Sequence, residues 1–139
     1  MAIRNLFPFQ QLSLKLWKKN QKRSFDIKII SVENSEAVGA NGTGRRGVIK
    51  TTYSQLVEKF GPPTYKGGDK TTAEWKLSFY VEDDYGEEDY VTATIYDWKM
   101  DSTPIGEHDW HIGGVRGKNA VDAVHMAMET NEPLKLTVG

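Results

Sequence analysis

The fold is decided by AEWKLSFYV at residues 73–81 and YVTATIYDW at residues 90–98. Apolar residues occupy every second position of the first stretch, and Val91, Ala93 and Ile95 do so in the second. Such alternation is typical of strands that bury one face in a core. The two stretches therefore predict a β-hairpin. Six of the eight residues that connect them, 82–89, are acidic, and we expect a solvated hairpin tip there because charge blocks edge-to-edge aggregation.

Helices are predicted on both sides of this hairpin. Residues 53–60 carry Leu56, Val57 and Phe60 on one face, Thr52 and Gln55 match a capping box, and Gly61 with two prolines ends the segment. The second helix is predicted at residues 120–129, with Asn119 as its N-cap.

Shorter segments complete the chain. Residues 25–32 and 134–138 alternate as strands do, and residues 110–112 form a third short apolar stretch before two glycines. Residues 39–47, GANGTGRRG, hold four glycines and no large apolar side chain, which predicts a mobile loop. The sequence thus predicts an α+β fold with an antiparallel sheet and two short helices, in the order β-α-β-β-β-α-β.

The chain of 139 residues suits one domain, which we assign to residues 25–139. Residues 1–24 form a predicted basic arm with no acidic residue, and its basic side chains are Arg4, Lys15, Lys18, Lys19, Lys22 and Arg23. The remainder carries 12 basic against 19 acidic residues. A basic arm on an acidic body favours an anionic partner or the acidic surface of a second copy, so we expect a homo-oligomer.

Composition excludes several functions. The chain has no Cys, which rules out thiol nucleophiles, disulfides and Cys-based metal sites. No apolar run approaches the roughly 20 residues that span a bilayer, and no signal peptide is recognisable, so we expect a cytoplasmic protein with no membrane partner. The net charge of −1 argues against general nucleic-acid binding, and sequence-specific recognition of nucleic acid is not expected.

Aromatic and basic residues gather around the second strand of the hairpin and the segment that follows it. Aromatic rings stack on bases, and Arg and Lys neutralise phosphates. The candidate ligand-binding residues here are Tyr96, Trp98, Lys99, Trp110, His111, Arg116 and Lys118. The alternative is that Trp98 and Trp110 are ordinary core residues.

The glycine-rich segment supplies two further candidates, Arg45 and Arg46. Residues 42–47 match G-x-G-x-x-G, but no helix follows directly and no acidic residue stands at the required distance, so a dinucleotide site is not predicted. Backbone amides beside Arg45 and Arg46 suit a phosphate or an acidic side chain. A solvated loop is the alternative.

His108, Asp109 and His111 form the densest group of potential metal ligands. In a strand His108 and His111 point to opposite faces, which disfavours a shared metal ion. No Ser is paired by its spacing with a His and a carboxylate. We therefore assign no catalytic residue, no metal and no cofactor.

Four ordered motifs, LVEKFGPP at 56–63, AEW at 73–75, ATIYDWK at 93–99 and WHIGG at 110–114, resemble a family of small, largely uncharacterised bacteriophage proteins. The resemblance covers about residues 47–129 and implies a phage origin. Small phage proteins without catalytic motifs act mostly by binding, and one such class resembles anti-defence proteins that sequester a host immune nucleotide signal.

The leading hypothesis is therefore an anti-defence binding protein in the host cytoplasm that encloses a nucleotide-like anion without turnover. The alternatives are a protein–protein inhibitor of a host defence enzyme, a nucleotide-cleaving enzyme that uses His108, Asp109 and His111, and a packaging component that uses the basic arm.

Overall fold

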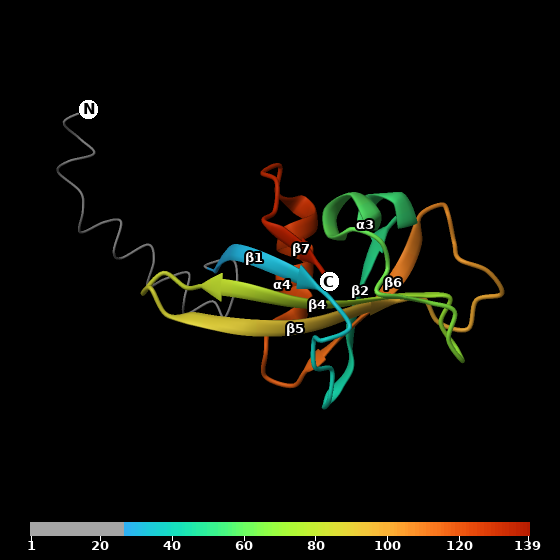
Figure 1. Ribbon diagram of the computed structural model, residues 1–139, viewed down its shortest axis with the longest axis horizontal. Helices are drawn as coiled ribbons and strands as arrows, with labels where there is room; N and C mark the ends of the chain where they lie inside the picture. Colours follow the sequence, from blue (N-terminus) through green and yellow to red (C-terminus); the bar gives the residue numbers. More distant parts are fainter. Residues whose placement is uncertain (1–26) are drawn as a thin grey trace.

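The computed structural model describes residues 27–139, which form one seven-stranded sheet with two helices (Figure 1). This confirms the predicted α+β class. The predicted basic arm, residues 1–24, lies outside the described residues. The elements are β1 (Lys28–Asn34), β2 (Thr43–Thr51), α3 (Tyr53–Phe60), β3 (Tyr65–Lys66), β4 (Ala73–Glu82), β5 (Glu88–Tyr96), β6 (His108–Val115), α4 (Ala120–Glu129) and β7 (Leu136–Val138).

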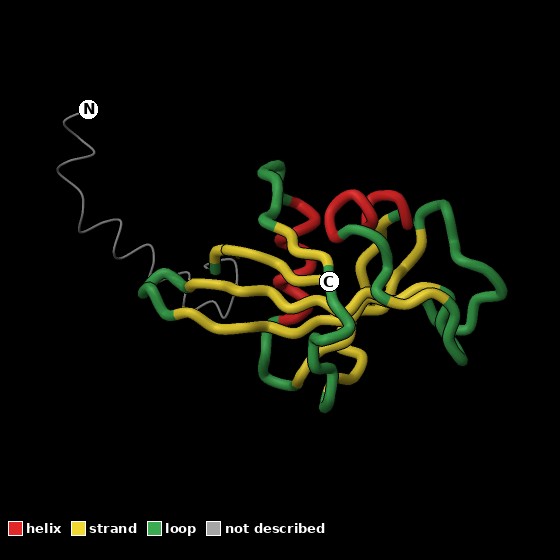
Figure 2. Tube along the Cα trace, viewed as in Figure 1, coloured by secondary structure: helices red, strands yellow, loops and turns green. Residues whose placement is uncertain are grey.

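The predicted hairpin is the centre of the sheet, whose strand order is β2-β6-β5-β4-β1-β7, with β3 paired to the end of β4. Strands β4 and β5 are antiparallel, with Trp75 opposite Ile95 and Leu77 opposite Ala93. All four of these side chains are buried. Figure 2 shows the acidic tip of this hairpin (green, at the left) projecting beyond both helices, as expected for a solvated turn.

Helix α3 has the predicted bounds and the predicted capping box. The backbone N–H of Gln55 donates to Thr52 Oγ1 over 3.1 Å, and the Gln55 side chain accepts from the Thr52 N–H over 3.2 Å. Gly61 ends the helix with a φ of 81°, a conformation that disfavours other residues.

Helix α4 also has the predicted bounds, and Asn119 occupies the predicted N-cap position without capping the helix through its side chain. The Asn119 side chain makes no capping hydrogen bond, because its backbone (φ −96°, ψ 51°) departs from the extended geometry that aims a cap side chain at the first turn. Its carbonyl oxygen accepts from the Ala123 N–H over 2.9 Å. In the described part of the chain, no helix combines the length and apolar character needed to cross a membrane.

Both helices cover the same face of the sheet, which we call the inner face. Phe60 of α3 meets Phe79 of β4 edge-on at 6.0 Å between ring centroids, and Trp75 meets Trp110 of β6 at 5.6 Å. Helix α4 presents small side chains to the sheet, and Ala120, Ala123, Val124 and Ala127 are buried. The large rings and the alanines together fill the core.

Strand β2 contradicts the predicted loop at residues 39–47, since it begins at Thr43 and pairs antiparallel with β6. Gly44 lies opposite Gly114 and Arg45 opposite Gly113. The backbone ladder and the close approach that glycines permit outweigh the low strand propensity of glycine, because propensity is a weak preference that tertiary context overrides.

The sheet is mixed rather than wholly antiparallel, since β7 pairs in parallel with β1. Asn34 at the end of β1 is buried, and its side-chain amide donates to the carbonyl oxygens of Phe60 over 2.7 Å and Pro62 over 2.8 Å. The end of α3 is thereby tied to this edge of the sheet. The short strand β3 and the strand β2 are the two elements absent from the predicted order.

The packing of α4 gives a first test. A Cβ at Gly114 would lie 2.4 Å from the Ala120 Cβ, so Gly114→Ala is expected to lower the free energy of unfolding by about 1–3 kcal/mol. The control is Gly106→Ala, whose Cβ meets nothing within 4 Å and which we expect to be neutral or stabilising by about 0.4–1 kcal/mol. Urea unfolding measures both. Equal stability of the two variants would contradict the close contact between α4 and β6.

Candidate functional site: a pocket on the outer face of the sheet

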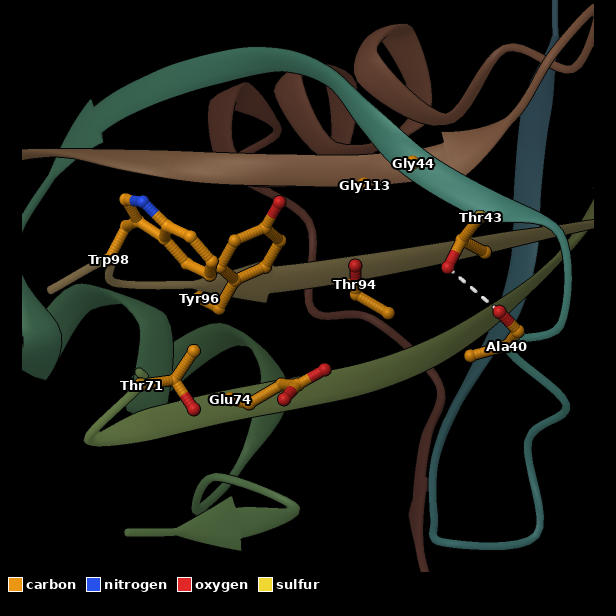
Figure 3. Close-up of a pocket in the computed structure, with 9 residues that line it drawn as sticks. All are labelled: Ala40, Thr43, Gly44, Thr71, Glu74, Thr94, Tyr96, Trp98 and Gly113. Atoms are coloured by element: carbon orange, nitrogen blue, oxygen red, sulfur yellow. Dashed lines mark hydrogen bonds between the residues drawn. The ribbon is translucent and has the colours of Figure 1, made fainter. Parts of the chain in front are cut away.

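The face of the sheet away from the helices carries a pocket of about 250 Å³, which we call the outer-face pocket (Figure 3). Thr94 and Tyr96 of β5 project into it, and Gly113 of β6 lies beside them. The rest of its lining comes from Trp98, from Glu74 and Thr71 on one side, and from Ala40, Thr43 and Gly44 on the other.

The pocket depends on the absence of a side chain at Gly113. A Cβ there would lie 2.3 Å from Thr94 Oγ1 and 3.6 Å from Tyr96 Cε1. Glycine at this position therefore leaves room for the Thr94 side chain, which any larger residue would displace. At the far side the Thr43 hydroxyl donates to the Ala40 carbonyl oxygen over 2.8 Å, which fixes that wall (Figure 3).

An aromatic cluster forms one end of the outer-face pocket. The Trp98 side chain remains 42% exposed, with its ring 6.2 Å from that of Tyr96 and 6.5 Å from that of His111, and nearly parallel to His111 at 23°. Lys70 Nζ and Lys99 Nζ lie 5.7 Å and 5.9 Å from the Trp98 centroid. A partly exposed indole with two ammonium groups over its ring suits a ligand that carries both an aromatic base and anionic groups.

A buried carboxylate holds this end of the site in place. Asp97 is fully buried and accepts from the backbone N–H groups of Thr72 over 2.7 Å and Ala73 over 3.2 Å, and from the Thr72 hydroxyl over 2.5 Å. The Lys99 N–H donates to the Lys70 carbonyl oxygen over 2.8 Å. The segments that carry the two lysines are thus fastened to one another on either side of Trp98.

Arg45 and Arg46 are separated by an irregularity in β2 between Arg45 and Gly47. Arg45 pairs with Gly113 and acts electrostatically on both Tyr96 and His111. Arg46 instead donates from Nε to the Gly114 carbonyl oxygen over 3.0 Å, on the side that faces α4. Only Arg45 therefore belongs to the surroundings of the pocket.

Partial burial shifts the pKa values of three groups at the pocket: His111, Tyr96 and Glu74. Burial lowers the pKa of His111, and the positive charges of Arg45 and then His108 lower it further. Burial raises the pKa of Tyr96, where Glu74 acts in the same direction and Arg45 against it. Burial also raises the pKa of Glu74, against the influence of Lys76. Desolvation thus disfavours the charged form of each of these three side chains, and a ligand of opposite charge would offset that cost.

Five of the residues predicted from sequence are brought together at this site: Arg45, Tyr96, Trp98, Lys99 and His111. Trp110 is instead fully buried against Trp75 in the core, so the alternative interpretation applies to it. The indole N–H of Trp110 has no hydrogen-bond partner among the described residues.

Arg116 and Lys118 lie in the turn after β6, at the end away from His111. Lys118 Nζ forms an ion pair with Asp89 at 2.8 Å, which also lowers the pKa of Asp89. The prediction that these two residues join the aromatic cluster is wrong, because β6 runs antiparallel to β5 and carries them to the opposite end of the sheet.

Sequence reasoning missed Glu74 and Lys70. Glu74 lies directly opposite Tyr96 in the hairpin. Both residues occupy polar positions of the two alternating stretches, so the sequence alone could have predicted that they share the outer face. Lys70 was not, because only the hydrogen bond between the loops brings it to Trp98.

Among residues 27–139, no three His, Asp or Glu side chains lie close enough together to hold a metal ion. His108 packs edge-on against Trp110 at 5.5 Å, and His111 faces Trp98. Comparison with protein-family models, with curated proteins and with solved structures gives no match to this chain.

The electrostatics of the site give a second test. Arg45 disfavours the protonated imidazole of His111, so Arg45→Ala is expected to raise the pKa of His111 while leaving it below 6.5, because burial is the larger cause. An NMR titration of the imidazole measures it. Arg46→Ala is the matched control and should leave this pKa unchanged. The same shift in both variants would contradict the placement of the two arginines on opposite faces.

Proposed function

We propose that this chain is a binding protein that holds a small nucleotide-like anion, unchanged, in the outer-face pocket. The resemblance to small bacteriophage proteins extends the proposal to its role. The ligand is then a host immune nucleotide signal, and its sequestration in the host cytoplasm is an anti-defence function.

The observation that carries this proposal is the partial exposure of Trp98 in the company of cationic groups. Lys70 and Lys99 stand within 6 Å of its ring centroid, and Arg45 acts on the neighbouring rings. Stacking on an aromatic side chain contributes about 1–3 kcal/mol per base, and Arg and Lys neutralise phosphate oxygens. A base and a phosphate on one ligand use both features together.

Binding without turnover is supported by the hydroxyl groups at the pocket. The Thr43 hydroxyl donates to a backbone carbonyl oxygen, and within residues 27–139 no pocket hydroxyl is hydrogen-bonded to a histidine. Nucleophilic catalysis requires such a pair, with a third group to orient the base.

A second copy of the chain is part of the proposal, because the outer-face pocket is open and apolar side chains stand exposed near it. Ile105 is 85% exposed, and Met100 is also exposed; both belong to the loop that follows Trp98. Covering such side chains is a common source of subunit association. Light scattering of the purified protein reports the number of copies.

A protein–protein inhibitor is the second candidate function, favoured by the outer face of the hairpin. Tyr80 and Tyr90 stack at 4.8 Å, and Tyr90 is 64% exposed. The Tyr80 hydroxyl donates to Glu88, which raises the pKa of Tyr80 to about 12. Tyrosines among acidic groups suit a basic protein surface.

The two candidates are separated by a thermal-shift panel of cyclic dinucleotides, cyclic trinucleotides, ADP-ribose derivatives and AMP. A ligand at 100 times its Kd adds about 2.7 kcal/mol to the stability of the folded state, which raises Tm by on the order of 10 °C. We expect a shift with at least one member, and recovery of that compound unchanged after denaturation. No shift with any member, together with salt-sensitive capture of a host protein through Tyr90, would favour the inhibitor instead.

Trp98→Ala is expected to weaken binding of the compound that gives the shift by about 1–3 kcal/mol, because it removes the stacking surface. Tyr90→Ala is the matched control, since it removes an exposed ring of β5 that does not line the pocket. Isothermal titration calorimetry measures both. An unchanged Kd for Trp98→Ala would place the ligand elsewhere and contradict the proposed site.

A further inference from the structure

Glu74 lines the outer-face pocket with a carboxylate that has no hydrogen-bond donor. It is half-buried, and Figure 3 shows its carboxylate directed toward the same space as the hydroxyls of Thr94 and Thr43. No described residue donates a hydrogen bond to it. The neighbouring Lys76 is turned away, because its Nζ donates to the Glu36 carbonyl oxygen over 3.2 Å and lies 5.5 Å from the Tyr65 ring centroid.

Partial burial of this carboxylate is costly, since it loses part of its hydration and no described residue donates a hydrogen bond in return. Burial raises the pKa of Glu74 for this reason. Strand β4 would avoid the cost with Thr or Gln at this position. The carboxylate therefore suits a ligand that brings hydrogen-bond donors to this side of the pocket.

Glu74 and Arg45 stand on opposite sides of the site. Glu74 on β4 pairs with Tyr96 on β5, whereas Arg45 on β2 pairs with Gly113 on β6. Three strand spacings of about 4.8 Å, roughly 14 Å, separate the two backbones. Tyr96 lies between the two charges, which influence its ionisation in opposite directions. The Arg45 side of the pocket thus favours an anionic group of a ligand, and the Glu74 side favours hydrogen-bond donors.

We propose that Glu74 accepts hydrogen bonds from the vicinal hydroxyls of a ribose, while Arg45 binds the phosphate and Trp98 stacks on the base of the same ligand. This inference rests on the proposed function and names its ligand class as ribonucleotides with free ribose hydroxyls. A carboxylate that accepts from ribose hydroxyls also fixes the sugar in dinucleotide-binding folds.

The test uses AMP, 2′-deoxy-AMP and 3′-deoxy-AMP, measured by isothermal titration calorimetry against the full-length protein. AMP is the smallest of these probes with a base, a phosphate and both hydroxyls. We expect each deoxy analogue to bind about 10- to 100-fold more weakly than AMP, since a hydrogen bond to a charged acceptor is lost. The substitution Glu74→Gln should weaken the binding of AMP and abolish the preference for AMP over the deoxy analogues.

Glu87→Gln, in the hairpin tip, is the matched control and should keep the preference. The Tm of unliganded Glu74→Gln should equal or exceed that of the parent protein, because the variant removes a desolvated charge, so weaker binding will not reflect unfolding. Equal affinities for the three nucleotides, or a preference that survives Glu74→Gln, would overturn the ribose inference alone. If none of the three binds at millimolar concentration while another member of the thermal-shift panel does, this inference fails and the proposed function stands. If no member of the panel binds, both fail.

Discussion

The architecture depends on the close approach of α4, β6 and β5 at Gly113 and Gly114. Successive residues of a strand face opposite sides of the sheet, so this dipeptide removes a side chain from each face. At Gly114 the missing side chain lets Ala120 of α4 rest on the sheet, and at Gly113 it leaves room for the Thr94 side chain that lines the pocket. The thickness of the core and the depth of the outer-face pocket are set by the same two residues.

Strand β2 extends this constraint to the distribution of charge. Arg46 and Gly47 both face α4, because a Cβ at Gly47 would lie 3.0 Å from Val121 Cγ2, whereas Arg45 faces the pocket. The Arg46 guanidinium therefore stabilises the fold by donating to the Gly114 carbonyl oxygen. The Arg45 guanidinium acts electrostatically on Tyr96 and His111. Glu74 across the hairpin supplies the opposite charge. The result is a site with an aromatic centre, a cationic side and an acceptor side.

The sequence predicted those parts of the fold whose signals are local. The capping box at Thr52 and Gln55 determines where α3 begins, and the alternation around Trp75 and Ile95 determines which side chains of the hairpin face the core. Strand β2 escaped prediction because its pairing depends on glycines in β6, more than 60 positions along the chain. Periodicity did not distinguish Trp98 from Trp110 either, since both occupy aromatic, strand-like segments; burial by α3 and Trp75 makes Trp110 a core residue. Glu74 could have been found from its place in the hairpin, whereas Lys70 is brought to Trp98 by the hydrogen bond from the Lys99 N–H to the Lys70 carbonyl oxygen.

The most direct test of the central claim, that the outer-face pocket is where this chain binds its ligand, is an ¹H–¹⁵N correlation NMR titration with AMP. The predicted result is a set of shifts concentrated at the Trp98 indole N–H and the backbone amides of Thr94 and Gly113, with the Trp110 indole N–H unchanged. Shifts confined to the hairpin tip or to α4, or no shifts at all, would contradict the account.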